Sequence, residues 1–186
     1  VYTAGTSSVL PGMTVGRSRA MGINDLGQVV GYHQDLITGE NKAFVYSAGD
    51  GVKHLAGLTS LQILFLGGVP VTGDGLKHLA GLTALQSLFL DSTEVTDDGL
   101  KHLAGLPALQ MLSLDSTRVT DDGLRHLTGL TALDSLDLDS TEVTDEGLKH
   151  LAGHPRLRWL SLGSTHVTDA GVEDFKQTHP DCLISR

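Results

Sequence analysis

Histidines that follow an acidic residue recur along the chain, and they are the first residues whose types could do chemistry. The stretch "STEVTDDGLKHLAGL", residues 92–106, places His102 four residues after Asp98, and near copies of it stand at residues 116–130 and 140–154. An acid close to a histidine can orient a general base, and histidines together with carboxylates can bind a metal ion. The histidines of this series stand 24 residues apart at His54, His78, His102, His126 and His150.

The spacing favours a structural role for these histidines over a catalytic one. Nucleophilic catalysis needs a serine or cysteine held against the base, and neither recurs beside the histidines. Zinc needs three or four converging ligands, whereas one outward histidine per unit provides no such cluster. We interpret each acid and histidine as an i, i+4 surface pair, and the same spacing pairs Asp97 with Lys101. Adventitious metal binding and catalysis are the alternatives, and we expect no enzyme, no cofactor and no metal site.

The chain repeats with a period of 24 residues from about residue 50 onward, and this period restricts the possible folds more than any single motif does. A glycine followed by leucine or valine recurs at Gly51, Gly75, Gly99, Gly123, Gly147 and Gly171. The cassette L-x-x-L-x-L recurs with the same period and begins at Leu61, Leu85, Leu109, Leu133 and Leu157. This regularity predicts a stack of equivalent structural units.

Each unit contains one strand pattern and one helix pattern. In "LQSLFLDST" the last two leucines alternate with other residues, which predicts a strand with its leucines facing the core. In "TDDGLKHLAGL" the leucines have helical spacing, Thr96 or Asp97 can cap the helix, and Gly105 fits a left-handed stop. Gly99 inside the first turn predicts close backbone packing against a neighbour. One unit cannot bury its leucines alone, so stacked units should form a parallel sheet inside and helices outside.

These cassettes resemble bacterial leucine-rich repeats, most closely the ribonuclease-inhibitor-like class, in which strands alternate with helices. The resemblance covers about residues 50–186 and implies an α/β solenoid, with a curved parallel sheet on the concave inside and short helices outside. It departs from the family at the ninth cassette position, where the usual asparagine or cysteine is replaced: Val69, Thr93, Thr117, Thr141 and Thr165. A threonine hydroxyl can still serve a backbone group in the turn.

Residues 49–186 are predicted to form one leucine-rich-repeat domain of about five 24-residue units with a C-terminal half-unit. Residues 49–60 give a helix-like half-unit without a preceding cassette. Residues 182–185 give a partial strand that could cover the last sheet edge. Cys182, the single cysteine, is expected to be a small buried side chain, with a reactive thiol as the alternative.

Residues 1–48 lack the period and are predicted to form a β-rich segment, either an orphan piece or a cap over the first repeat. Strand-like runs cover Ala20–Asn24, Gln28–His33 and Lys42–Ser47. Residues 25–27, "DLG", signal a hairpin turn between the first two runs. On "GINDLGQVVGY" and "KAFVYSAG" the segment resembles one HAF repeat of bacterial extracellular proteins, with Lys42 in place of the family's histidine. The resemblance implies a secreted or cell-surface protein, and a cytoplasmic location is the alternative.

The charge balance limits the classes of partner. The chain of 186 residues has a net charge of −9, and the acidic excess lies entirely in residues 49–186. An acidic body argues against sequence-independent binding to nucleic-acid phosphates and fits a basic partner. No apolar run reaches the roughly 18 residues of a membrane span.

The strand positions that point away from the leucines differ from unit to unit. One row is Ile63, Ser87, Met111, Ser135 and Trp159, and the next is Phe65, Phe89, Ser113, Asp137 and Ser161. Gly67, Asp91, Asp115, Asp139 and Gly163 follow just past the strands. Variable side chains on a constant frame suit a recognition surface, and aromatic anchors often dominate binding energy. The predicted protein-binding residues are Phe65, Phe89, Asp91, Met111, Asp115, Asp137, Asp139 and Trp159.

Two alternatives stand beside this hypothesis. Single exposed aromatic residues are ordinary, and stacking of Phe65 on Phe89 could simply stabilise the sheet. The acidic row Asp91, Asp115 and Asp139 would place like charges about 5 Å apart on neighbouring strands. These charges should recruit a cation or a basic side chain, and calcium is conceivable because it takes oxygen ligands, although no calcium-loop motif is present.

The sequence therefore predicts a non-enzymatic scaffold that binds a protein or peptide, with basic and apolar groups, on the concave face of a solenoid. One alternative is a structural spacer segment of a larger surface protein. Another is the substrate-recognition part of an enzyme whose catalytic domain lies outside this chain. Fold class alone does not decide among them, because one fold hosts many functions.

Overall fold

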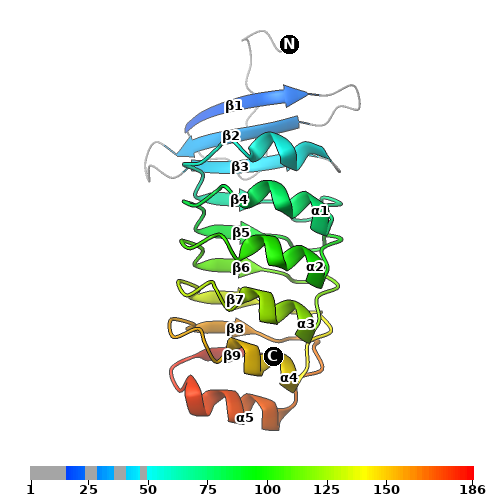
Figure 1. The fold of residues 1–186 in the computed structure, drawn as a ribbon, viewed down its shortest axis with the longest axis vertical. Coiled ribbons are helices and arrows are strands. Elements are labelled where there is room, and N and C mark those ends of the chain that lie inside the picture. The colour runs from blue at the N-terminus through cyan, green and yellow to red at the C-terminus, as the bar shows by residue number, and fades with distance from the viewer. Residues whose placement is uncertain (1–15, 24–28, 36–40, 47–49) are drawn as a thin grey trace.

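Figure 1 shows a single sheet whose strands follow one another in chain order, with short helices covering one of its sides. The computed structural model describes residues 16–23, 29–35, 41–46 and 50–186. The strands are β1 Gly16–Ile23, β2 Val29–Asp35, β3 Asn41–Tyr46, β4 Ile63–Phe65, β5 Ser87–Phe89, β6 Met111–Ser113, β7 Ser135–Asp137, β8 Trp159–Ser161 and β9 Leu183–Ser185. Pairing is antiparallel from β1 to β3 and parallel from β3 to β9. The predicted α/β solenoid architecture is confirmed.

Residues that are 24 positions apart in the sequence pair with each other across the sheet. Leu64 pairs with Leu88, and Leu88 pairs with Leu112, so equivalent residues of successive units stand side by side without slippage. A slip of one residue would turn every buried leucine to the opposite face, which explains why such short strands keep one register. The leucines of the cassettes from β5 to β7 are fully buried. Each contributes about 1.5–3 kcal/mol of transfer free energy relative to an exposed side chain.

The helices are too short to be stable alone and are held by the same core. The α-helices are α1 Gly73–Leu76, α2 Asp97–Leu100, α3 Asp121–Leu124, α4 Asp145–Leu151 and α5 Asp169–Thr178. The first three continue directly into single 3-10 turns, at Lys77–Leu79, Lys101–Leu103 and Arg125–Leu127. A further 3-10 helix, Asp50–Leu55, covers the predicted N-terminal half-unit. Leu100 and Leu103 of the second helical segment are fully buried, as their helical spacing predicted.

Threonine side chains bond to the backbone of the turn at the position where the family pattern has asparagine. The hydroxyls of Thr93, Thr117 and Thr141 donate to the carbonyls three residues earlier, at 2.7, 2.6 and 2.6 Å. These threonines are buried, so each bond satisfies a polar group that would otherwise cost free energy. The expectation that threonine can serve the turn backbone is confirmed.

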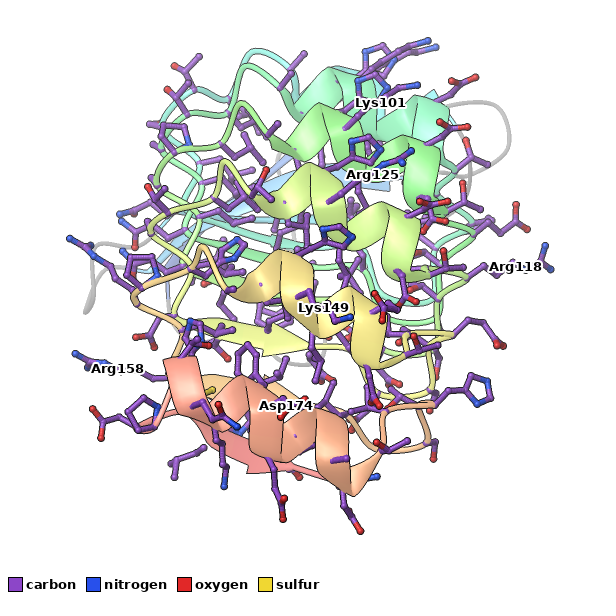
Figure 2. All side chains as sticks on the ribbon, turned by 60° about the horizontal axis from the view of Figure 1, so that its bottom comes forward. Lys101, Arg118, Arg125, Lys149, Arg158 and Asp174 are labelled. Atoms are coloured by element: carbon purple, nitrogen blue, oxygen red, sulfur yellow. The ribbon has the colours of Figure 1, made fainter. Side chains whose placement is uncertain are left out.

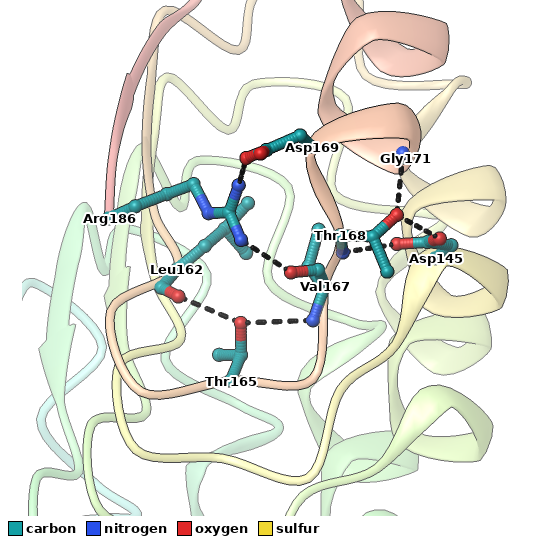
Figure 3. A network of polar contacts seen from close by, with 8 residues as sticks. All are labelled: Asp145, Leu162, Thr165, Val167, Thr168, Asp169, Gly171 and Arg186. Atoms are coloured by element: carbon teal, nitrogen blue, oxygen red, sulfur yellow. Dashed lines mark hydrogen bonds and ion pairs between the residues drawn. The ribbon is translucent and has the colours of Figure 1, made fainter.

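The first aspartates of α2, α3 and α4 link neighbouring repeats, and the predicted i, i+4 pairing of Asp97 with Lys101 is wrong. Asp97 Oδ1 accepts from the backbone N–H of Thr120 at 2.8 Å, and its Oδ2 accepts from the Thr120 hydroxyl at 2.8 Å. The next junctions repeat this arrangement, from Asp121 to Thr144 and from Asp145 to Thr168. Figure 3 shows the last of the three. We call each such arrangement an aspartate–threonine link.

The second acid of α2, α3 and α4 makes a surface ion pair, at i, i+3 and not at i, i+4. Lys101 lies 3.8 Å from Asp98, Arg125 lies 3.1 Å from Asp122, and Lys149 lies 2.5 Å from Glu146. Figure 2 shows the three basic side chains on successive helices. All six side chains are largely exposed, so water and salt screen the charges and the pairs add little to stability.

Glycines were assigned correctly at one position and wrongly at another. A Cβ built on Gly99 would lie 2.6 Å from the Cα of Gly73, which confirms the predicted close approach of neighbouring helices. Gly105 has no left-handed backbone, so its predicted role as a helix stop is wrong. In the described chain the left-handed residues instead follow the strands, at Gly68, Ser92, Ser116, Ser140 and Ser164.

Both ends of the repeat stack carry additional strands. Strands β1 to β3 overlap the three predicted N-terminal runs, whereas the predicted turn at residues 25–27 lies outside the described residues. Strand β3 pairs in parallel with β4, and β9 pairs in parallel with β8, so the predicted half-strand does lie at the far edge. Cys182 is 2% exposed, as expected, and burial raises the pKa of its thiol to about 11.

Two buried histidines were not predicted. His154 occupies the position where the preceding unit has Leu130, and its Nε2 donates to the Leu127 carbonyl at 2.9 Å. His179 Nε2 donates to the His154 carbonyl at 3.1 Å, and its ring stacks on Phe175 with centroids 4.4 Å apart. Both side chains are at least 93% covered and bonded to backbone, so they are satisfied core groups.

Candidate binding surface on the strand face

The side of β4–β9 that faces away from the helices carries the residues that the sequence selected; we call it the strand face. Register pairing places Ile63, Ser87, Met111, Ser135, Trp159 and Leu183 in one row across the strands. A second row contains Phe65, Phe89, Ser113, Asp137, Ser161 and Ser185. Both rows match the predicted order, because the pleat directs every second side chain to the same face.

The N-terminal end of the strand face is aromatic. The rings of Phe65 and Phe89 are stacked, with centroids 4.7 Å apart and planes 7° from parallel. Phe65 is 46% exposed, so the stack covers only part of its surface. A stacked pair of this kind is worth about 0.5–1.5 kcal/mol beyond area burial, and it holds a rigid apolar platform at the surface.

A hollow of about 320 Å³ lies in the middle of the strand face, next to this platform. Its lining consists of Phe89, Met111, Leu112, Ser113, Ser135, Asp137 and Trp159. Met111 and Trp159 are 39% and 37% exposed, so their apolar surfaces border the opening. The volume lies at the lower end of the range for ligand sites, which is roughly 300–1,000 Å³.

The sizes of the row residues explain the hollow. In the first row the small Ser135 stands between Met111 and Trp159. In the second row the small Ser113 stands between Phe89 and Asp137. Neighbouring strands are about 4.8 Å apart, so each serine leaves a gap of about 10 Å between two larger side chains. The two gaps lie side by side and form one depression.

Asp137 is the charged residue in the lining of the hollow. Partial burial raises its carboxyl pKa, and the nearby Asp139, Asp115 and Asp91 carboxylates raise it further, against a lowering by the Asp139 backbone N–H. That N–H donates to Asp137 Oδ1 at 3.1 Å. The hollow therefore combines apolar walls with one carboxylate in a negative field, which suits a cationic group.

The carboxylates of the acidic row past the strands accept hydrogen bonds from neighbouring residues, which weakens the calcium alternative. Asp91 accepts from the Ser113 hydroxyl. Asp139 Oδ1 accepts from the Ser161 hydroxyl and from the Gly163 backbone N–H, both at 2.6 Å. Among the side chains that the structure describes, no three acidic, histidine or cysteine residues converge as metal ligands do. These bonds lessen the demand of the carboxylates for a bound cation.

The recurrent histidines are not brought together with these residues. His78, His102 and His126 are half-buried on the helical side, and His150 is exposed there. The side chain of His54 lies outside the described residues. Among the described side chains, the histidines therefore join neither a catalytic arrangement nor a cluster of metal ligands, which were the two alternatives to a structural role.

Sequence reasoning missed Leu183, and it placed Ser113 and Ser135 on the strand face without recognising the hollow that they leave. Leu183, on the last strand, is 71% exposed and extends the first row beyond Trp159. Ser113 and Ser135 create the hollow, and their small size beside large neighbours was the signal that could have revealed it. The eight predicted residues otherwise lie on or at the edge of this face, although their role in binding stays a prediction.

In the described part of the chain, no helix is both long and apolar enough to cross a membrane. A family model described as Leucine Rich repeat matches residues 129–152. A search of curated proteins gave no match.

Three solved structures of bacterial proteins resemble the chain at low identity. One is a Leptospira interrogans LRR protein, at 22% identity and a TM-score of 0.55, covering 72% of this chain and 33% of that chain. Another is an internalin C2 from Listeria monocytogenes, at 21% identity and a TM-score of 0.51, covering 76% of this chain and 79% of that chain. A second Listeria monocytogenes internalin has 22% identity and a TM-score of 0.48, covering 70% of this chain and 42% of that chain.

The chain thus spans less than half the length of two of these three proteins. At such identities the likeness bears on fold alone. Together with the parallel strand order and the repeated leucine ladder, it identifies the fold of this chain as a leucine-rich-repeat solenoid.

Proposed function

We propose that this chain is a non-enzymatic scaffold that binds a protein or peptide through the strand face. The observation that carries the proposal is the contrast between a constant frame and a variable surface. Successive strands bury leucine at the same register positions, while their outward positions change among phenylalanine, methionine, serine, aspartate and tryptophan. Exposed apolar patches rimmed by charge are typical of interaction surfaces.

Charge supports a partner with basic and apolar groups. The strand face carries Asp137 in the second row and Asp91, Asp115 and Asp139 at its edge, and β4–β9 contain no lysine or arginine. Basic side chains are displayed on the helices, as Figure 2 shows for Lys101, Arg125 and Lys149. Complementary charge accelerates encounter and selects among partners.

A peptide-display selection on the immobilised full chain tests the proposal. Selected peptides are synthesised, and their dissociation constants are measured against two double variants. Phe89→Ala with Trp159→Ala truncates two aromatic side chains that line the hollow. Lys101→Ala with Arg125→Ala is the control, because it changes the same number of residues on the helical side. We expect the first variant to weaken binding at least about tenfold, and the second to change it less than about twofold.

A selection that yields no binders, or binders that ignore the loss of Phe89 and Trp159, would contradict the scaffold and favour the structural spacer. Phe65 and Phe89 stacking would then be a sheet-stabilising contact only. The substrate-recognition alternative also predicts a binding strand face. It is separated from the simple scaffold by the presence of a catalytic domain elsewhere in the full reading frame.

We further propose that the protein acts outside the cell or on its surface, that residues 1–48 form one HAF-like segment, and that residues 49–186 are repeats of the ribonuclease-inhibitor-like class. The motifs "GINDLGQVVGY" and "KAFVYSAG" support the first two statements. The 24-residue period with alternating strands and helices supports the third. Fractionation of the source cells, with detection of the protein by antibody, tests the location.

A further inference from the structure

The hollow on the strand face has two unlike halves. Phe89, Met111 and Trp159 provide apolar and aromatic surface. Asp137 provides a carboxylate; it lies in the same row as Phe89, two strands away. Two residues along one strand lie about 7 Å apart, and two strands span about 10 Å. The depression is thus wide enough for one long side chain with an apolar stem and a polar head.

The carboxylate of Asp137 is only partly used. Its Oδ1 accepts from the Asp139 backbone N–H, whereas its Oδ2 has no hydrogen-bond or ion-pair partner within the described part of the chain. The hydroxyl of Ser135, between Met111 and Trp159, makes no hydrogen bond to another described residue either. An occupant with several donors could satisfy both groups, and the neighbouring acids favour a positive charge on it.

Arginine fits this combination better than lysine. A guanidinium is planar and weakly hydrated, stacks on aromatic faces, and presents five N–H donors in fixed directions. It can lie against Trp159, on the strand next to Asp137, while donating to Asp137 Oδ2 and to the Ser135 hydroxyl. A lysine ammonium is compact and strongly hydrated, so it gains less from the apolar walls. An acidic occupant would meet the field of four aspartates.

We propose that the hollow receives one arginine side chain of the partner, an inference that rests on the proposed function of the strand face. Asp137 pairs with the guanidinium, and Trp159, Met111 and Phe89 enclose the aliphatic stem. The proposal names a feature of the partner, an arginine beside apolar residues. It also distinguishes Asp137 from Asp91 and Asp139, whose carboxylates are bonded to serine hydroxyls.

Trp159 is the only tryptophan in the chain and borders the hollow, so its fluorescence reports occupancy directly. The probes are three peptides, acetyl-Leu-Arg-Leu-amide and the same peptide with lysine or with citrulline, the uncharged isostere of arginine. We expect a saturable change in Trp159 emission with the arginine peptide and at least about tenfold weaker binding of the citrulline peptide, because the positive charge that pairs with Asp137 is lost. The lysine peptide should bind more weakly than the arginine peptide.

Asp137→Asn should weaken the arginine peptide at least about tenfold, because the charge of the pairing group is lost. Asp98→Asn, an equal charge change on the helical side, should alter binding less than about twofold, because screening removes distant surface charges. Circular dichroism verifies that both variants fold. Equal binding of the arginine and citrulline peptides, equal or tighter binding of lysine, or an unaffected Asp137→Asn variant would overturn the proposal.

The two failures are distinguishable. If display-selected peptides lose affinity on truncation of Phe89 and Trp159 but bind Asp137→Asn normally, the strand face is a binding surface, and the proposal that the hollow receives an arginine is wrong. If the selected peptides ignore both changes, the strand face itself is not the binding surface.

Discussion

Replacing Asp121 with alanine should destabilise the protein considerably more than replacing the adjacent Asp122. The two aspartates share the first turn of α3, so both interact with the positive end of the same helix dipole. They differ in what their carboxylates bind. Asp121 links to the next repeat through the backbone N–H of Thr144 at 2.8 Å and the Thr144 hydroxyl at 2.7 Å, whereas Asp122 pairs with Arg125 at the surface.

The magnitude follows from the bonds lost. Asp121→Ala removes two hydrogen bonds to a charged acceptor and leaves a partly buried N–H of Thr144 without its partner, a loss of about 2 kcal/mol. Asp122→Ala removes an ion pair whose side chains are 55% and 71% exposed, together with part of the dipole interaction. Its expected cost is about 0.5 kcal/mol.

Urea denaturation at neutral pH, followed by circular dichroism, measures the difference between the two variants. In a stack of repeats the junction free energies hold neighbouring units together, so loss of one junction also reduces cooperativity. Asp121→Ala should therefore lower the midpoint and broaden the transition. Equal destabilisation by the two substitutions, within about 0.5 kcal/mol, would refute the aspartate–threonine link as a stabilising contact.

Three further predictions follow from the described contacts. Gly99→Ala should cost about 2 kcal/mol or more in thermal or urea unfolding, because its Cβ would meet the Gly73 backbone at 2.6 Å; a neutral effect would contradict the close approach. The Cys182 thiol, with its pKa raised to about 11 by burial, should react with a thiol reagent at neutral pH only after unfolding, and rapid native labelling would contradict its burial. The hydrogen bonds from the Thr168 backbone and hydroxyl lower the pKa of Asp145, so its stabilising contribution is complete above the ordinary value of 3.8 and is lost as pH falls below it. The unfolding curves of wild type and Asp145→Asn should accordingly converge on acidification, and a constant difference at every pH would contradict this.

The repeat made the frame predictable from sequence. Period-two alternation selected the core-facing Leu88 and Leu90, and the unbroken 24-residue spacing set the register of β4–β9. The rows of the strand face followed from the same pleat. Gly99 was recognisable because glycine is unfavourable inside a helix and therefore needs a compensating contact.

The polar contacts were not predictable in the same way. Spacing alone cannot distinguish Asp97 from Asp98, because both stand in one helical turn near a basic residue. The difference appears only when the next repeat brings Thr120 against Asp97. Gly105 resembled a left-handed stop, but the helical segment ends in a 3-10 turn, and Ser92 takes the left-handed conformation after the strand.

The hollow depends on side-chain volumes compared across strands, which no pattern along a single repeat displays. Ser113 and Ser135 look like ordinary surface residues until the register sets each between two large neighbours. The hydrogen bonds also distinguish the acids. The Ser113 hydroxyl donates to Asp91, whereas Asp137 keeps one carboxylate oxygen without a partner among the described residues. Residues that the repeat does not copy thus form the candidate site.

Hydrogen–deuterium exchange of the full chain, with and without a saturating display-selected peptide, tests the central claim most directly. Because a ligand lying across the sheet stabilises the strands beneath it, slower exchange is predicted at the backbone amides of β6, β7 and β8, around Met111, Ser135 and Trp159. The amides of α2, α3 and α4 on the opposite side should change less. Protection confined to those helices, with unchanged exchange across the strands, would contradict a binding surface on the strand face.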